Sequence, residues 1–210
     1  MAVGTKAGSN GADTMVVLTP FKLKTIEVPI VGTSELIVHN WSQKAKTMML
    51  DKQMGKTRQK KEPKVPEDDY EGSLYKMPDG DGYGFPAPGF KAAMVGACRN
   101  FSGLPMTVAK VAIRVNGEKN GPLVRIYGEP RMREDMVRLE TGVADLRYRA
   151  GFREWRAMLS ITFNAGMLTE GNVVDLVAAA GFGGIGDWRP SAPKSASGTY
   201  GTFEVQTTEP

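Results

Sequence analysis

The stretch Glu154–Gly181, EWRAMLSITFNAGMLTEGNVVDLVAAAG, decides the class of fold. Apolar residues in its first part alternate with polar residues or methionine, a pattern that predicts a half-buried strand over Glu154–Thr162. The alternating positions are Trp155, Ala157, Leu159, Ile161 and Phe163. Thr169 can cap a helix over Glu170–Ala180, and Gly181 can end it. A strand followed directly by a helix predicts a domain of mixed α and β structure.

The segments around this stretch continue the mixture of strands and helices. Two more helices are predicted, over Ser42–Met54 and Pro88–Arg99, and Pro88 suits a first helical position because its missing N–H is not needed there. Strands are predicted over Leu23–Val31, Glu35–His39, Thr107–Val115, Leu123–Tyr127, Val137–Glu140, Asp145–Tyr148 and Thr202–Gln206. This order predicts an α+β, ferredoxin-like fold with a βαββαβ core. Its RRM-like antiparallel sheet would carry helices on one face and long loop insertions.

Composition narrows the class of protein. The 210 residues are 41% hydrophobic and 24% charged, which suits one domain over residues 1–210 and excludes collagen, coiled coils and wholly disordered chains. A single cysteine excludes an intramolecular disulfide, a CxxC zinc site and a cysteine-ligated iron–sulfur cluster. A single histidine excludes sites that need two imidazoles. We therefore predict no metal and no cofactor, with Cys98 as a free, buried thiol.

Several segments lack the apolar residues that a fold needs. Met1–Leu18 is rich in glycine, serine and threonine, so a flexible N-terminus is expected. Gly55–Asp69 has one large apolar residue, Val65, and is expected to be a mobile excursion, while Asp79–Gly89 is expected to be an irregular loop. We recognise no secretory signal, and no apolar run approaches the roughly 18 residues that cross a bilayer. A cytoplasmic protein without membrane contact is therefore expected.

Positive charge is concentrated in Lys44–Lys64. Eight cations against two acids give this segment a net charge of +6, more than the +4 of the whole chain. The cations are Lys44, Lys46, Lys52, Lys56, Arg58, Lys60, Lys61 and Lys64. Such a run binds phosphates without sequence preference, and the alternative is a solvated loop whose lysines serve solubility. The acidic run that follows, VPEDDYE, either balances the lysines or contacts a neighbouring subunit.

Two further stretches favour an anionic ligand. In Phe85–Arg99, FPAPGFKAAMVGACR, the free N–H groups of a helix start and Lys91 would form an anion site, the alternative being ordinary packing. In Phe182–Phe203, glycines leave the backbone open and aromatic residues lie next to cations, a combination that stacks bases and holds phosphates. The residues concerned are Trp188, Arg189, Lys194 and Tyr200. The alternative is a structural loop in which Trp188 fills the core.

The remaining charged residues favour structure over chemistry. Eight arginines between Arg125 and Arg156 are interspersed with acids, which predicts surface ion pairs or a subunit interface. His39 is interpreted as a hydrogen-bonded structural residue. Asp79 and Asp81 could hold a magnesium ion, but the sequence DGDG also forms a good turn, so no metal is predicted there.

Together these motifs resemble the RAMP superfamily, the ferredoxin-like RNA-binding subunits of CRISPR effector complexes. Pro88-Gly89-Phe90-Lys91-Ala92-Ala93-Met94, with Arg99 after it, is similar to the early family motif Pro-Gly-Ser-Ser-Leu-Lys-Gly-Ala-Leu-Arg, but two residues shorter before the lysine. Gly198-Thr199-Tyr200-Gly201-Thr202-Phe203 resembles the glycine-rich loop before the last strand of the family. The segment 55–83 lies where backbone subunits carry a thumb-like insertion, and Gly184–Pro190 resembles small phage-encoded proteins of this type. The first strand lacks the family signature, and His39 is not placed like the histidine of RNA-cleaving members, which puts cleavage in doubt.

We therefore predict a non-catalytic protein that binds single-stranded RNA or DNA and oligomerises along the strand, as a homo-oligomer or within a multi-subunit nucleoprotein complex. The predicted binding residues, expected to converge in one cationic trough, are Lys44, Lys46, Lys52, Lys56, Arg58, Lys60, Lys61, Lys91, Arg99, Trp188, Arg189, Lys194 and Tyr200. Two alternatives stay open. One is a structural or assembly protein of a phage or adaptor complex, and the other is a metal-dependent nuclease that uses Asp79, Asp81 or Asp187.

Overall fold

The computed structural model describes residues 21–41, 43–56, 63–138, 141–193 and 196–206. The predictions for Met1–Leu18, Arg58, Lys60, Lys61 and Lys194 concern residues outside this description, as do the side chains of Lys44 and Lys52. Within the described ranges, no helix has the length and hydropathy that crossing a membrane requires.

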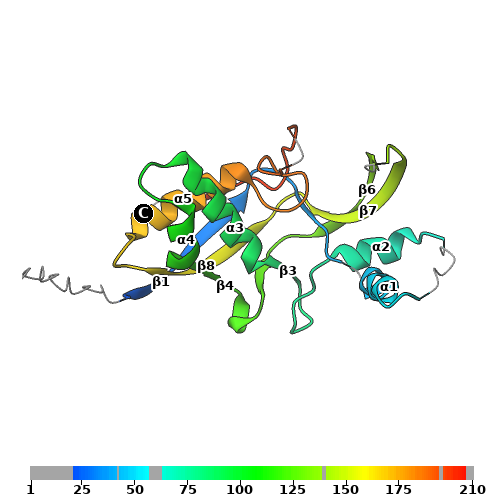
Figure 1. The fold of residues 1–210 in the computed structure, drawn as a ribbon, viewed down its shortest axis with the longest axis horizontal. Helices are drawn as coiled ribbons and strands as arrows, with labels where there is room; N and C mark the ends of the chain where they lie inside the picture. Colours follow the sequence, from blue (N-terminus) through cyan, green and yellow to red (C-terminus); the bar gives the residue numbers. More distant parts are fainter. Residues whose placement is uncertain (1–20, 42, 57–62, 139–140, 194–195, 207–210) are drawn as a thin grey trace, which may run out of the picture.

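A four-stranded antiparallel sheet forms the centre of the molecule (Figure 1). Its strands are β1 (Leu23–Gly32), β4 (Ile113–Asn116), β8 (Arg156–Asn164) and β9 (Phe203–Val205), in the spatial order β4-β8-β1-β9. Along the chain, α3 (Ala87–Ala97) lies between β1 and β4, and α5 (Glu170–Gly183) lies between β8 and β9. This βαββαβ order, with β1 and β8 central and paired from Leu23–Asn164 to Val31–Arg156, is ferredoxin-like. The predicted fold class is confirmed.

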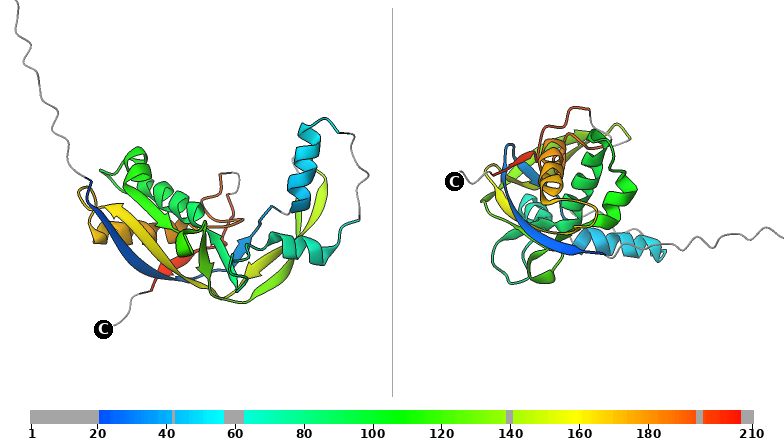
Figure 2. Two further views of the ribbon diagram at one scale, coloured as in Figure 1. Left: turned by 90° about the horizontal axis from the view of Figure 1, so that it is seen from below. Right: turned by 90° about the vertical axis from the view of Figure 1, so that its left-hand side faces the viewer.

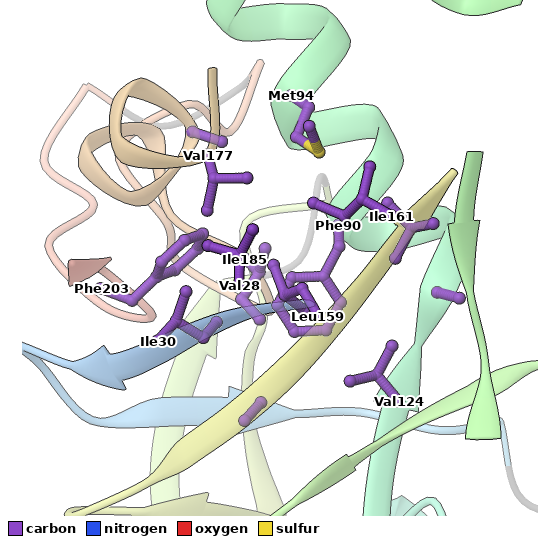
Figure 3. Close-up of a cluster of buried hydrophobic side chains, with 14 of the residues drawn as sticks. Val28, Ile30, Phe90, Met94, Val124, Leu159, Ile161, Val177, Ile185 and Phe203 are labelled. Carbon is purple, nitrogen blue, oxygen red and sulfur yellow. The ribbon is translucent and has the colours of Figure 1, made fainter. Parts of the chain in front are cut away.

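The helices cover one face of this sheet (Figure 2). Helices α3 and α5 pack against each other, and α4 (Met106–Ala112) packs against α3. Between sheet and helices, the side chains of Ile30, Leu159 and Ile161 are at most 1% exposed and lie near Phe90 of α3 (Figure 3). Burying each such side chain contributes about 1.5–3 kcal/mol. We call this sheet and its three helices the body, because one continuous apolar core holds them together.

A second sheet leads away from the body. Its strands are β2 (Leu36–Val38), β6 (Pro130–Arg138) and β7 (Ala144–Phe152), in the order β2-β7-β6. Helix α2 (Pro66–Ser73) packs on β7, and α1 (Gln43–Gln53) stands beside it. We call α1, α2 and the β6–β7 hairpin the projection. It forms the end of the molecule opposite α4 and α5 (Figures 1 and 2).

Three predicted element boundaries are wrong. The strand predicted over Val137–Glu140 overlaps β6 only at Val137 and Arg138, since β6 begins at Pro130. Thr107–Val115 is not one strand, because its first part is α4 and only Ile113–Asn116 is a strand. Its β-branched residues favour a strand, but Ala109 and Ala112 are buried at helical spacing. The last helix is capped by Gly184, with φ of 69°, and not by Gly181. Gly181 serves close packing instead, since a Cβ there would lie 2.0 Å from the carbonyl oxygen of Phe203.

Two segments are more regular than predicted. Within the expected excursion, Pro66–Ser73 forms α2, with proline at its start and three acids in its first turn, where the helix dipole favours negative charge. Within the expected loop Asp79–Gly89, β3 (Tyr83–Pro86) pairs with β5 (Leu123–Ile126). Short 3₁₀ turns cover Cys98–Asn100 and Glu118–Asn120. Cys98 is buried as predicted, and burial raises the pKa of its thiol.

Candidate nucleic-acid interface

The glycine-rich loop Gly184–Gly201 crosses from the body to the second sheet. The backbone N–H of Asp187 donates to the carbonyl oxygen of Ile37 at 3.0 Å, and that of Gly201 donates to Glu35 at 2.9 Å. Gly201 has φ of 68°, and a Cβ there would lie 1.8 Å from the carbonyl oxygen of Ile185. Only glycine allows the loop to turn and approach this closely. The loop is therefore held against β2 by its backbone, which leaves its side chains free to serve other contacts.

The loop sets two aromatic rings on two arginines of the second sheet. The guanidinium carbon of Arg149 lies 4.4 Å from the ring centroid of Trp188, and that of Arg133 lies 5.0 Å from the centroid of Tyr200. The two rings are 5.9 Å apart. Trp188 also has φ of 55°, which is uncommon for a bulky residue and typical of functional or strained positions. We call these four residues the arginine–aromatic layer.

Arg149 is the most deeply buried charge at this junction, with a side chain only 1% exposed. Its two terminal nitrogens donate to Asp187 at 2.7 Å and to Asp135 at 2.8 Å. Its Nε is buried without a hydrogen-bond partner among the described residues. His39 lies 3.3 Å from the same Asp187 oxygen, so the predicted hydrogen bond of this histidine is present, and its structural role stays a prediction. Burial works to raise the pKa of Asp187, but the hydrogen bonds with His39 and Arg149 outweigh it and hold that pKa below its usual value.

Arg133 extends this network of ion pairs toward the body. It pairs with Asp135 at 3.0 Å and with Glu35, which also accepts from Arg131 at 2.8 Å. Burial lowers the pKa of Arg133, but hydrogen bonds with Asp135 and Tyr200 and the nearby carboxylates raise it above its ordinary value. The balanced arginines were predicted to form surface ion pairs or a subunit interface. At this junction they form ion pairs, but Arg149 is buried and Arg133 is only 12% exposed, which places fixed charges beneath the loop.

A groove of about 560 Å³ lies beside this layer, between α2, β7 and the loop. Its walls include His39, Trp41, Lys64, Arg147, Arg149 and Asp187. Trp41 is 54% exposed, which leaves its ring open to a ligand. Lys64 donates to Asp145 at 2.6 Å, whereas the Arg147 guanidinium lies 3.8 Å from the same carboxylate and remains 37% exposed. The groove thus offers one stacking surface and one loosely paired cation.

The structure brings together only part of the predicted site. Trp188, Arg189 and Tyr200 are half-buried at the junction, and Arg189 donates to the Gly186 carbonyl oxygen at 2.8 Å within the loop. Lys46 lies on α1, and Lys56, just after α1, pairs with Asp51 at 2.8 Å.

Lys91 and Arg99 lie on the body and do not line the groove. They are eight residues apart along one helical segment, so about 12 Å of helix axis separates them. Convergence of all three predicted stretches in one trough therefore stays a prediction, and Lys46, Lys56, Lys91 and Arg99 are not among the residues that line this groove.

Sequence reasoning missed Trp41, Arg147 and Arg149. Trp41 lies three residues after the end of β2, and an exposed tryptophan so soon after a strand is a usable signal. Arg147 and Arg149 alternate along β7, so they share one face of the sheet, but only the register of β7 shows that this face meets the loop.

Two of the three acids named in the nuclease alternative, Asp79 and Asp187, pair with arginines. Asp79 accepts from Arg125 at 2.7 Å and from Lys119 at 3.4 Å, and its side chain also accepts from the backbone N–H of Asp81. The hydrogen bond from Asp81 is the main cause that lowers the pKa of Asp79, with those from Arg125 and Lys119 adding to it. Across the described part of the chain, no group of three or more histidine, cysteine or acidic side chains could hold a metal ion.

Among the comparisons with known proteins, only the comparison of structures finds proteins similar to this chain. No family of known sequences matches the chain, and no curated protein matches it either. It is similar to a chain of the type III-B Cmr-β complex bound to cognate target RNA, with a TM-score of 0.49 and 11% identity, over 89% of this chain and 60% of that one. Cmr6 from Pyrococcus furiosus gives a TM-score of 0.40 and 11% identity, over 89% of this chain and all of Cmr6. This chain therefore spans less than two thirds of the length of the first neighbour.

Proposed function

We propose that this chain is a non-catalytic protein that binds a single-stranded nucleic acid at the junction between the body and the projection. The observation that carries the proposal is the groove, where exposed Trp41 and loosely paired Arg147 lie beside the arginine–aromatic layer. Aromatic rings stack bases and arginines hold phosphates, so this pairing suits an unpaired strand. Trp188, Arg189 and Tyr200 do not line the groove itself, but Trp188 lies on Arg149 of its wall, and contact of these three residues with the strand stays a prediction.

RNA is the ligand to test first, because one structural neighbour comes from a complex bound to target RNA. We extend to this chain, as part of the proposal, a RAMP-like role as one subunit of a larger RNA-binding assembly. The cations of α1 remain a prediction within that role. The nuclease alternative is disfavoured because Asp79 and Asp187 are each held by an arginine.

The test is fluorescence anisotropy with labelled single-stranded RNA and DNA, in separate arms, at low and at moderate salt. Trp41→Ala is expected to weaken binding by about 1–3 kcal/mol, the usual contribution of one base–aromatic stack. Arg147→Gln is expected to lower the slope of log affinity against log salt by about 0.7, as one lost phosphate contact on a single strand does. Arg114→Gln is the matched control, since Arg114 is an exposed arginine on β4 of the body.

Three results would contradict the proposal. The first is a wild-type chain that binds neither RNA nor DNA at low salt. The second is a Trp41→Ala variant that binds as tightly as Arg114→Gln. The third is cleavage of the labelled strand in the presence of magnesium, which would favour the nuclease alternative.

A further inference from the structure

Exposed apolar side chains gather on the projection. Among the described residues, 18 large hydrophobic side chains are exposed, and ten of these belong to the projection and the chain segments that flank its helices. The ten are Trp41, Met48, Met49, Leu50, Met54, Val65, Met132, Met136, Val143 and Leu146. Concentrated apolar exposure on a water-soluble surface is typical of a protein–protein contact. The projection is therefore the part of the molecule best suited to a protein partner.

Helix α1 is the element of the projection whose described side chains are most exposed to solvent. Met48, Met49, Leu50 and Met54 are between 45% and 56% exposed, and among the described α1 side chains only Asp51 is partly buried. An isolated helix of fewer than about 12–15 residues is marginal in water, and α1 has 11. A partner that covers these side chains would stabilise the helix.

The projection carries opposite charges on its two helices. The sequence of α1 contains three lysines and one aspartate. That of α2 contains four acids, of which Glu67, Asp68 and Asp69 are exposed in the first turn. Glu71, the fourth, pairs with Lys76 at 2.7 Å. The projection thus holds a basic helix with exposed apolar side chains, an acidic helix and a hairpin that exposes Met132, Met136 and Leu146, which makes it complementary to a second copy of itself.

We propose that two copies of this chain join through their projections in a two-fold symmetric dimer, with α1 of each copy on α2 and the β6–β7 hairpin of the other. Two-fold symmetry uses the complementary surface twice, because α1 of each copy then meets the acids of its partner. A membrane surface fits α1 poorly, since Met48, Met49 and Leu50 are consecutive and point about 100° apart around the helix. A nucleic acid would use the lysines and leave the methionines uncovered. The proposal does not rest on nucleic-acid binding by the groove.

The test measures molar mass by light scattering and sedimentation equilibrium, on protein treated with nuclease until no nucleic acid remains. The wild type is expected to be a reversible dimer. The double variant Met48→Ser, Leu50→Ser is expected to be monomeric at the same concentration, and its far-UV circular dichroism should report an otherwise intact fold. Phe182→Ser is the matched control, because Phe182 is 85% exposed on α5 of the body, and its mass should equal that of the wild type.

A charge exchange tests the geometry. Two variants are compared: the single variant Lys46→Glu, and the double variant Glu67→Lys, Asp68→Lys. Each is expected to raise the dimer dissociation constant about tenfold, because every repulsive contact occurs twice in a two-fold symmetric dimer. Mixing the two variants should restore dimers, since each altered α1 then meets an altered α2 of opposite charge.

Several outcomes would overturn the proposal. A wild-type monomer at every concentration would do so, and so would a mass that Met48→Ser, Leu50→Ser leaves unchanged. Failure of the mixture to restore dimers would rule out the contact between α1 and α2. An open series of larger oligomers would replace the symmetric dimer with a head-to-tail contact, and assembly only after RNA is added would assign the surface to the nucleic acid.

Discussion

The body and the junction beside it are held together by opposite means. In the body, Phe90, Leu159 and Ile161 are at most 1% exposed, and an apolar core fills the space between helices and sheet. At the junction, the side chain of Arg149 is equally buried but lies between two carboxylates and under the ring of Trp188. Apolar burial is non-directional, whereas paired charges hold their partners at set angles. The body therefore supplies stability, and the junction supplies orientation for the loop.

The largest difference in the free energy of unfolding should appear between a variant that loses an apolar side chain of the body and a variant that loses one of the projection. Phe90 contacts the rings of Phe85 and Phe203, at 5.6 and 6.2 Å between centroids, so Phe90→Ala leaves a cavity in the core. It should reduce the free energy of unfolding by about 3–5 kcal/mol. Met49→Ala on α1 should change the free energy of unfolding of the dissociated single chain by less than about 0.5 kcal/mol. Urea unfolding measures both, and equal losses would refute the contrast between the two regions.

The next largest effect concerns the buried charge. Arg149→Met should destabilise the fold by about 3 kcal/mol, which is the lower end of the cost of leaving buried charges unpaired. The cost is at the lower end because Asp135 is still paired with Arg133, and Asp187 with His39. Arg131→Met is the control, since Arg131 also pairs with a carboxylate but is 39% exposed, and it should cost less than about 1 kcal/mol. Urea unfolding gives both values. A loss for Arg149→Met no larger than that of the control would mean that the buried pairs do not hold the junction.

The smallest effect is the pH dependence of Asp187. Its pKa in the folded protein lies below the ordinary value of 3.8, so the charged form stabilises the fold above that pH and this contribution is lost as the pH falls through the folded pKa. Asp187→Asn should therefore be less stable than the wild type at neutral pH and should lose less stability from about pH 5 downward. Thermal midpoints against pH measure this, with Asp175→Asn on an exposed position of α5 as control. Parallel curves for Asp187→Asn and the wild type would contradict the assignment.

Much of the body could be predicted from the sequence because its pattern is local. The alternation in β8 and the Thr169 cap of α5 each lie within one element, and both are confirmed. Helix α4 was missed because the valines of Thr107–Val115 fit a strand as well as a helix. The choice is made by the body, which buries Ala109 and Ala112 together. Local pattern thus identifies elements whose periods are clear and fails where tertiary packing decides.

The site was less predictable because its contacts join distant parts of the chain. The loop with Trp188 and Tyr200 could be found from its glycines and aromatic residues. Its partners could not, since Arg149 and Asp187 are 38 positions apart and meet only after β7 and the loop are placed. The balance of arginines and acids predicted ion pairs but could not show which pairs are buried. Lys91 and Arg99 illustrate the converse, because sequence motifs suggested that they share a site with the loop, yet neither of them lines the groove.

The central place of β1 has a consequence for synthesis on the ribosome. Leu23 pairs with Asn164, which is 141 positions later in the chain, and the other neighbour of β1, β9, comes later still. At elongation rates of about 5–20 residues per second, β1 is synthesised about 7–30 s before its partner strand β8, and both of its edges are unpaired during that time. A bare strand is a template for mispairing, so this interval is when chaperones would be needed most and when overproduction would first cause aggregation.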